Sequence, residues 1–570
     1  MLGIKPVEMA VVIGVLIFAL LYPFVDQNYL NNYQWDTPVF ATHVAQFRQT
    51  LATGNLKALP PLQGWPQYFD AYDVLLTILT AATAGVGRIF PIVTQMLPTV
   101  EIQTNFWARW MSLGFHCIGM AFLWLALLRL YARPLVALSL ALLVALAPTL
   151  IDMDLGRNDW GVIGSLCAVV YFNIRLAQGD QRRSVLIGLG VFAGLLVTFK
   201  LNGPAFVIFV ASALLSIIVH RGMDVGRIGV LLVVFMLTVI FLSVRQIYYL
   251  DEFFPNLIAQ IDDLNRRWFS AYPKSSLFYY AWGILESQGK MYRLLIWGSA
   301  PVVLLLLFLR ISLTSVFVFG SFGVFVILSL VVDYGFARGG YHLLPLFVMM
   351  IAVAFGALES ALRAVIRRPR LAGLLAGTVV AGLLAEPLLV VGKNYAVQAA
   401  RMYNRPSAVF VTRTLPAKWM GTAFRPGTRM ATIYWNDPSC IPPIHNLGFV
   451  FDNTLLVKLG GAEHYRNFDF VKPPSLNGLR STADVLIVTD WQQNMLNWLL
   501  RSLDHPEAVE SWKQWLETMR REVPSVVFSA SSPGYCYRRV EIFVLDPTSS
   551  AAALRATLTT LETPVEVRGP

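Results

Sequence analysis

The chain has 570 residues, of which 56% are hydrophobic and only 14% are charged. Soluble globular proteins have about a quarter of their residues charged, so this composition excludes a soluble protein and indicates a polytopic membrane protein. The net charge of +11 does not indicate nucleic-acid binding, because the basic residues lie mainly between apolar stretches and not in a tract on a soluble module.

Apolar stretches of about 20 residues predict eleven transmembrane helices, and the Lys and Arg content of the connections orients them. The first stretch resembles a secretory signal, but it lacks a small-x-small cleavage site and other spans follow. We therefore expect an uncleaved helix with Lys5 in the cytoplasm. The predicted spans are 8–25, 107–130, 134–151, 160–178, 184–199, 203–219, 228–248, 293–309, 311–332, 341–362 and 371–391.

The segment 26–106 lies between the first two spans, and its middle, Tyr72 to Val93, is apolar but interrupted by Gly, Arg and Pro. If this middle crossed the bilayer, Arg129 and Arg133 would face outside, against the positive-inside trend. We therefore expect an interfacial or re-entrant element within an outer loop. A second long outer loop is predicted at 249–292.

From about residue 392 the composition becomes that of a soluble domain. With eleven spans and a cytoplasmic N-terminus, we expect an extracytoplasmic α/β domain at 392–548, a flexible tail at 549–570, and a transmembrane domain at 1–391. Cys440 and Cys536 in the outer domain either form a disulfide or remain free. Strands are predicted at 430–434, 483–489 and 540–545, and helices at 491–502 and 506–521.

Several polar and ionisable residues from distant parts of the chain fall at the outer interface on this topology. Ionisable residues at membrane depth are costly, so they are default candidates for a functional site. Each also has a structural interpretation, such as a helix cap, a solvated turn, a snorkelling lysine or a hydrogen-bonded histidine. The candidates are Asp36, Asp152, Asp154, Asp159, Lys200, Arg338, Tyr341 and His342.

Asp36 precedes an amphipathic run from Val39 to Leu51 that is suited to lie in the interface plane. Asp36 or Thr37 occupies the expected N-cap position, with Pro38 in the first turn. The carboxylate is therefore either a cap, worth about 1 kcal/mol, or a functional group, and the two roles can coexist.

A divalent cation is a candidate cofactor. Asp152 and Asp154 form a DxD sequence, and hard cations such as Mg²⁺ or Mn²⁺ take oxygen ligands of this kind. Asp36 could complete the ligand set. A lone DxD is common in other contexts, so the sequence leaves metal dependence open.

The order of these motifs resembles the GT-C superfamily of polyprenyl-phosphate-sugar-dependent glycosyltransferases, the group that includes the protein O-mannosyltransferases and the lipid A aminoarabinose transferase. The similarity covers most of residues 8–362 and, more loosely, the external domain. Tyr341 stands where the family has Arg, and Arg338 precedes it by three residues. The matching stretches are Asp36-Thr-Pro-Val-Phe, Thr53-Gly-Asn55, Trp65-Pro66-Gln-Tyr68, Phe106-Trp-Ala-Arg109, Asn158-Asp159, Gly194-Leu-Leu-Val-Thr198-Phe-Lys200 and Tyr341-His342-Leu-Leu-Pro345.

The resemblance implies transfer of a hexosyl or pentosyl group from a polyprenyl-phosphate donor to a hydroxyl of an envelope glycan, lipid or protein, at the outer face of a bacterial inner membrane. It implies that Asp36 is the general base. Substrate binding is implied for Arg109, Asp159, Lys200, Arg338, Tyr341 and His342.

Two alternative functions remain open. One is a lipid-phosphate phosphotransferase or polymerase at the same interface. The other is a transporter of a lipid-linked or anionic substrate, which would place ionisable residues near span midpoints and show internal symmetry. In this chain the charges lie at span ends.

Overall fold

The computed structural model describes most of the chain, in two compact units. One unit comprises residues 1–26 and 39–399, and the other comprises residues 27–38 and 400–570. The described residues are 5–25, 37–59, 71–97, 99–148, 159–199, 203–222, 224–253, 255, 288–309, 323, 343–409, 411–412, 415–432, 450–451, 473–490, 492–494, 497, 506–530, 538–546 and 566–568.

The first unit is a bundle of apolar helices, so the chain is a polytopic α-helical membrane protein. Ten of the predicted spans coincide with helices, and the remaining one, 311–332, falls outside the described residues apart from Gly323. Among the described helices, seven are long and apolar enough to cross a membrane. The helices at the predicted spans are α1 (Pro6–Leu21), α5 (Val100–Leu130), α6 (Pro134–Ala145), α8 (Asp159–Ala177), α9 (Arg183–Phe199), α10 (Gly203–Arg221), α11 (Val225–Leu242), α15 (Lys290–Leu309), α17 (Leu344–Val365) and α18 (Pro369–Val409).

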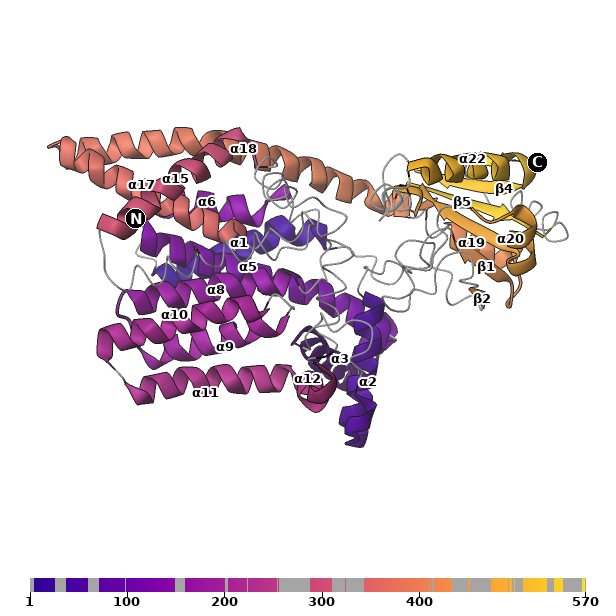
Figure 1. Cartoon of the computed structure of the whole chain (residues 1–570), viewed down its shortest axis with the longest axis horizontal. Helices are drawn as coiled ribbons and strands as arrows, with labels where there is room; N and C mark the ends of the chain where they lie inside the picture. Colours follow the sequence, from indigo (N-terminus) through magenta and orange to yellow (C-terminus); the bar gives the residue numbers. More distant parts are fainter. Residues whose placement is uncertain are drawn as a thin grey trace. The chain divides into compact units, whose positions relative to one another are not determined.

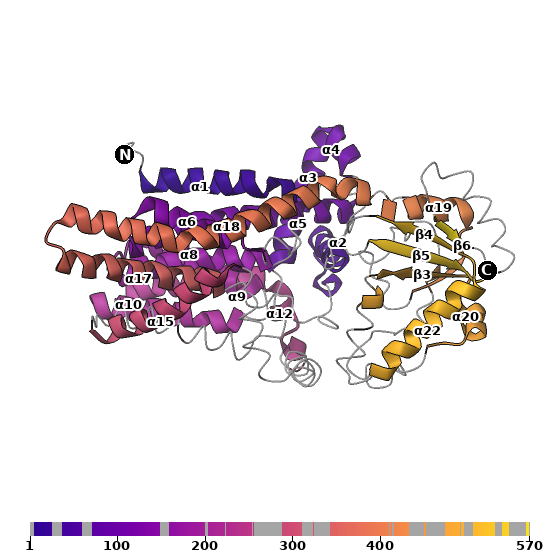
Figure 2. The ribbon, with the colours of Figure 1, turned by 90° about the horizontal axis from the view of Figure 1, so that it is seen from above.

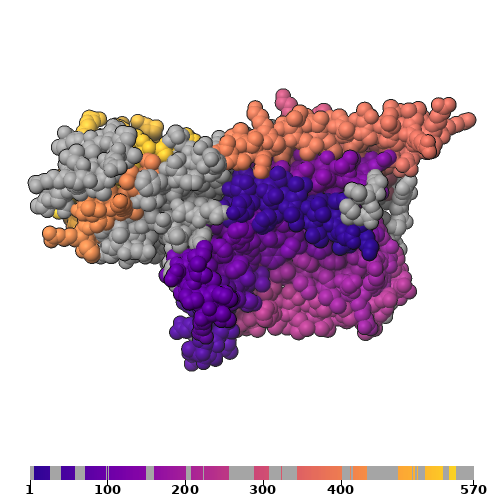
Figure 3. All heavy atoms as spheres, turned by 180° about the vertical axis from the view of Figure 1, so that it is seen from behind, coloured from indigo at the N-terminus to yellow at the C-terminus, as the bar shows by residue number. Residues whose placement is uncertain are grey.

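The first helix is packed as part of this bundle. Figure 3 shows α1, in indigo, on the surface beside the orange α18. The Tyr395 hydroxyl of α18 donates a hydrogen bond to the Leu20 carbonyl over 2.7 Å, and the ring of Tyr395 also packs against Phe24. The short 3-10 helix Tyr22–Phe24 extends α1 at this point.

The helices α5 and α8 run in the same direction through the centre of the bundle. The ring of His116 packs edge-on against Trp160 near the start of α8, and Arg129 donates a hydrogen bond to Gln178 just after its end. The intervening α6 returns the chain between them. Nearly every residue of α8 is buried, so α8 is the central helix of the unit.

Basic residues gather at one end of the bundle. The buried Glu359 of α17 accepts hydrogen bonds from the Tyr131 hydroxyl (2.9 Å), Arg133 (2.7 Å) and Arg363 (2.5 Å). Asp180, which follows α8, forms ion pairs with two further arginines. These are connections that the positive-inside rule assigns to the cytoplasm.

Further helices occupy the opposite end of the bundle, as Figures 1 and 2 show. The Tyr72 hydroxyl donates to the Ala108 carbonyl over 3.0 Å, and the Trp107 indole donates to Thr83 over 2.6 Å. These bonds hold α3 against the first half of α5. α3 is itself one of the seven helices that are long and apolar enough to cross a membrane, so its place in the interface stays a prediction from the sequence. The helices at this end are α2 (Thr37–Thr53), the 3-10 turn Leu56–Ala58, α3 (Ala71–Ile89), α4 (Pro91–Met96) and α12 (Val244–Tyr248).

The predicted span 228–248 is divided into two helices, which corrects the sequence-based prediction. α11 ends at Leu242, the chain turns at Ser243 (φ −124°, ψ 38°), and α12 begins at Val244. No Pro or Gly marks this position, so hydropathy alone gives no signal for the break.

The second unit is built on a mixed sheet with strand order β2-β1-β3-β5-β4-β6. β1 pairs in parallel with β2 and β3, whereas β3, β5, β4 and β6 pair antiparallel in succession. The three predicted strands correspond to β1, β3 and β5. The strands are β1 (Arg429–Thr432), β2 (Val450–Phe451), β3 (Val485–Thr489), β4 (Ser525–Ser529), β5 (Arg539–Val544) and β6 (Glu566–Arg568).

Alternate residues of β3 face two separate hydrophobic cores. Leu486 and Val488 pack with the helices α20 and α22, and Val485 and Ile487 pack with α19 on the opposite face. This alternation follows from the two-residue period of a strand. Both faces are therefore covered, as expected for a small α/β domain. The helices are α19 (Leu415–Ala423), α20 (Leu476–Thr482) and α22 (Pro506–Glu522).

The expectation of a loose tail at 549–570 was wrong at Glu566–Arg568, because these residues form β6 and pair with β4. A three-residue strand is too short to show a periodic pattern. Cys440 and Cys536 lie outside the described residues, as does most of the predicted helix 491–502.

Candidate functional site

Four aromatic rings from four helices meet at the end of the bundle that carries α2 and α3. Phe40 of α2 lies 4.8 Å from Tyr72 of α3, between ring centroids. Tyr72 lies 6.4 Å from Phe199, the last residue of α9, and Phe199 lies 5.1 Å from Phe115 of α5. We call these four residues the aromatic cluster.

The start of α8 joins the aromatic cluster through Gly161. A Cβ atom at this glycine would lie 2.7 Å from the Phe199 ring, so only glycine permits the contact. The cluster therefore brings together the first turn of α2, the first turn of α8 and the last turn of α9. These are the helix ends next to which Asp36, Asp159 and Lys200 stand in the sequence.

Arg109 and Asp159 are the two candidate site residues that the structure describes. Arg109 lies six residues before Phe115 on α5 and is 1% exposed, and Asp159 is the first residue of α8 and is 4% exposed. Burying a charged side chain is costly unless other groups compensate it. Neither side chain is a solvated surface charge. Their burial favours a specific role over the interpretation that each residue merely marks the end of a span.

The other candidates lie outside the described residues. Leu343, which follows His342 and is 1% exposed, begins the chain that enters α17. Glu359 near the far end of α17 belongs to the basic end of the bundle, so α17 starts at the same end as the aromatic cluster. The undescribed candidates are Asp36, Asp152, Asp154, Lys200, Arg338, Tyr341 and His342.

A buried polar group that the sequence analysis missed lies beside the aromatic cluster. His43 Nδ1 of α2 is 2.7 Å from Asp73 Oδ2 of α3, and His43 Nε2 is 3.5 Å from Arg245 Nη1 of α12. Asp73 is 0% exposed and Arg245 is 1% exposed. We call these three residues the His43 triad.

Geometry assigns the hydrogen positions of the His43 triad. Arg245 can only donate, so His43 Nε2 must accept and Nδ1 must carry the hydrogen that Asp73 receives. The second oxygen of Asp73, Oδ1, has no hydrogen-bond partner among the described residues. A sequence signal was present, because Asp73 is an acidic residue within the apolar stretch 72–93 and such residues are functional candidates by default.

The metal prediction rests on residues outside the described part. Within that part, no group of three or more His, Cys, Asp or Glu side chains is placed to hold a metal ion. The predicted ligands, Asp36, Asp152 and Asp154, do not fall within it. Metal dependence stays a prediction from the sequence.

No protein-family model and no curated protein matches the chain. Solved structures do. ArnT from Cupriavidus metallidurans, solved bound to undecaprenyl phosphate, has a TM-score of 0.51 and 12% identity, over 95% of this chain and 98% of that one. The oligosaccharyltransferase of Archaeoglobus fulgidus, in its apo form, has a TM-score of 0.50 and 10% identity, over 93% of this chain and 74% of that one.

Both neighbours are GT-C enzymes. The chain has the GT-C fold. The resemblance that the sequence motifs suggested is thereby confirmed at the level of fold. The likeness spans both units of the chain, since it covers more than nine tenths of its length.

Proposed function

We propose that the chain is a membrane glycosyltransferase that moves a sugar from a polyprenyl-phosphate donor to an acceptor hydroxyl. The observation that carries this proposal is the aromatic cluster, which brings together the helix ends next to Asp36, Asp159 and Lys200 at one end of a GT-C fold. The similarity to an ArnT solved with undecaprenyl phosphate supports the choice of a lipid-phosphate donor.

The proposed reaction is a displacement at the anomeric carbon of the donor. Asp36 takes the proton of the acceptor hydroxyl while its oxygen forms the new glycosidic bond. The bond between the anomeric carbon and the phosphate oxygen breaks, and its electron pair leaves with the polyprenyl phosphate. Arg109, Lys200 and Arg338 supply the positive charge that stabilises the leaving phosphate.

The remaining candidates are assigned to substrate binding. Asp159, Tyr341 and His342 would orient the sugar and the donor phosphate next to the base. Asp36, Asp152 and Asp154 would hold a divalent cation if one is required, because their oxygens suit Mg²⁺ or Mn²⁺. Such an ion would neutralise part of the phosphate charge.

We also propose an orientation in a bacterial inner membrane. The arginines around Glu359 and Asp180 are assigned to the cytoplasmic end by the positive-inside rule. The aromatic cluster, the His43 triad and the unit within residues 400–570 are then extracytoplasmic. The acceptor would be an envelope glycan, lipid or protein on that side.

The decisive experiment compares the envelope glycans and lipids of cells with and without the protein by mass spectrometry. A species heavier by one sugar should disappear when the protein is absent. Purified protein in vesicles should then release polyprenyl phosphate in step with glycosylated acceptor. A transporter would move the intact donor lipid between leaflets, and recovery of only intact donor would refute the proposal.

A further inference from the structure

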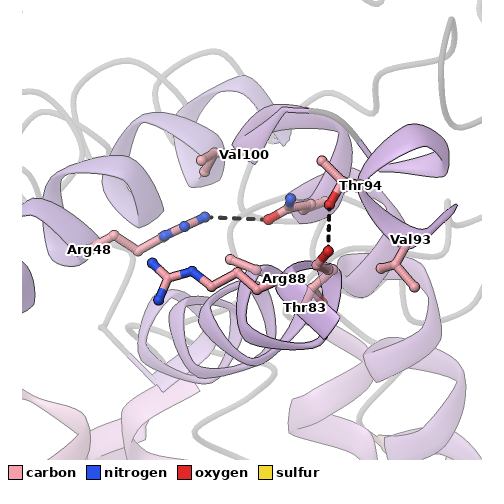
Figure 4. A pocket seen from close by; sticks show the side chains of 9 residues that line it. Arg48, Thr83, Arg88, Val93, Thr94 and Val100 are labelled. Carbon is pink, nitrogen blue, oxygen red and sulfur yellow. Dashed lines mark hydrogen bonds between the residues drawn. The ribbon is translucent and has the colours of Figure 1, made fainter. Parts of the chain in front are cut away.

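A cavity of ≈ 310 Å³ lies among α2, α3, α4 and α5 of the helical unit. Figure 4 shows the guanidinium groups of Arg48 from α2 and Arg88 from α3 directed into the same space. Gln103 of α5 and Thr94 of α4 also line it. We call it the arginine pocket.

The described residues that line the arginine pocket include two arginines and no carboxylate. Arg48 donates to the neutral oxygen of Gln103 over 3.3 Å, and Gln103 is itself fixed by donating to the Leu97 carbonyl over 2.9 Å. Arg88 has no hydrogen bond or ion pair with any other described residue. Two guanidinium groups in one small cavity repel each other, and an anion between them converts this repulsion into attraction.

The pocket is held in shape by a close contact between α3 and α4. Thr94 donates to the Gly87 carbonyl over 3.2 Å. A Cβ atom at Gly87 would lie 2.5 Å from the Thr94 hydroxyl oxygen, so glycine is needed where the helices approach. The pocket is therefore part of a fixed turn between the two helices.

Large apolar side chains surround the pocket on the outside of the same turn. Ile89 is 72% exposed, Phe90 58%, Ile92 63% and Met96 58%. An apolar tip with cationic residues at its base is typical of a segment that inserts into one leaflet and places its charges among the lipid headgroups. Arg88 directly precedes this tip in the sequence.

We propose that the arginine pocket binds the phosphate group of an anionic membrane lipid in the leaflet that the α3–α4 turn enters. Arg48 and Arg88 hold the phosphate oxygens, a geometry for which the planar guanidinium is well suited. The exposed apolar tip packs against the acyl chains. This site is independent of sugar transfer, because it rests on the charge and shape of the pocket alone.

The test uses the full chain, purified and reconstituted in nanodiscs of phosphatidylcholine with increasing phosphatidylglycerol. Native mass spectrometry counts the phosphatidylglycerol molecules that stay bound when the bilayer is removed. The Arg48→Gln/Arg88→Gln variant should bind one fewer of the tightly held lipids, with an affinity lower by about tenfold or more. Arg425→Gln/Arg480→Gln removes the same charge from exposed positions of the other unit and should change nothing.

The single variant Arg88→Gln separates lipid binding from folding, because Arg88 is exposed and makes no hydrogen bond or ion pair with a described residue. It should reduce binding while the thermal midpoint stays unchanged. Equal lipid retention by the wild type, the single variant and the double variant would overturn the proposal. Inorganic phosphate added at millimolar concentration should not displace the lipid, and displacement would show that the pocket is a site for soluble phosphate instead.

Discussion

Some charged residues of the helical unit are exposed at its surface, whereas others are buried in its interior. Arg109, Asp159, Asp73 and Arg245 are each less than 5% exposed, although all four types are usually found at the surface. All four lie at the end of the bundle where the aromatic cluster is. A functional site is the natural explanation for such a concentration of buried charge in a membrane protein.

Asp36→Asn separates the two roles considered for this carboxylate. Asparagine caps a helix as well as aspartate does, but it cannot take a proton at neutral pH. Sugar transfer should fall by about 100-fold or more, which is the usual contribution of a general base, while membrane abundance and thermal midpoint stay the same. The matched control is Asp251→Asn, which changes an exposed carboxylate. Transfer near the wild-type rate in Asp36→Asn would show that the residue is only a cap.

The His43 triad is testable by a double-mutant cycle. Asp73→Asn removes the charge that accepts the His43 hydrogen, and His43→Ala removes the donor. Each single change should lower the thermal midpoint and the free energy of unfolding. The double change should lower the free energy of unfolding by less than the sum of the two single changes, with a coupling of about 0.5 to 3 kcal/mol. Strictly additive effects in detergent-solubilised protein would mean that the 2.7 Å contact contributes nothing.

At the residue scale, the sequence predicted individual charges better than their partners. Asp159 was identified because it stands at a span end, and Arg109 because it matches an arginine of the GT-C motif order. Asp73 and His43 were not, because their pairing depends on how α2 crosses α3, and 30 residues separate them in the chain. The position of Arg245 depends on the turn at Ser243, and no Pro or Gly in the sequence indicates that turn.

At the scale of elements, glycine decides how closely the central helices approach. Gly119 of α5 faces Gly164 of α8, and a Cβ on Gly119 would lie 2.5 Å from the Gly164 Cα atom. A Cβ on Gly164 would collide with the backbone carbonyl of Phe115. Small residues at such crossings are the usual way for membrane helices to pack, because lipid provides no hydrophobic drive.

Gly164→Ala should destabilise the bundle, because the added methyl meets backbone that cannot move aside. Gly114→Ala on the neighbouring helix is the matched control, since a Cβ there would have no atom of a described residue within 4 Å. The control gains helix propensity of about 1 kcal/mol and should be neutral or slightly stabilising. The measurement is the thermal midpoint in detergent. Equal midpoints for the two variants would contradict the packing described here.

The positions of the helices were predicted well, because a membrane span is a long apolar stretch that is easy to recognise. The helix boundaries and the short strands were not predicted well. α5 begins at Val100, seven residues before the predicted span 107–130, because the Thr99 hydroxyl caps it by accepting from the Ile102 amide. β2 and β6 are two and three residues long, and no periodicity can be read from so few.

At the scale of the whole molecule, the fold class and the division into a helical unit and an α/β unit followed from composition. Positive-inside counting also assigned Arg133 and Arg363 to one side, and the structure places both on Glu359. The geometry of the proposed catalytic centre could not be predicted, because sequence order alone cannot fix the side-chain positions of Lys200, Arg338 and His342, and these residues lie outside the described part of the chain.

The α/β unit should lose stability in acid through one ion pair. Arg429 donates to both carboxylate oxygens of Asp484, and these hydrogen bonds hold the pKa of Asp484 below its ordinary value of 3.8. The stabilisation is complete above that value and disappears as the pH falls through the lowered pKa. Asp484→Asn should therefore lower the urea midpoint of residues 400–570 at pH 7, and this effect should shrink as the pH falls through the lowered pKa of Asp484. A pH-independent difference would exclude the ion pair as the cause.

The pairing of β6 with β4 has a consequence for the order of folding during synthesis. β4 forms an edge with unpaired backbone groups until residues 566–568 have been made, after every other strand described. Open sheet edges are where foreign strands add and aggregation begins. The α/β unit is therefore exposed to mispairing at β4 until residues 566–568 have been made, and a chaperone that shields β4 would protect the nascent chain.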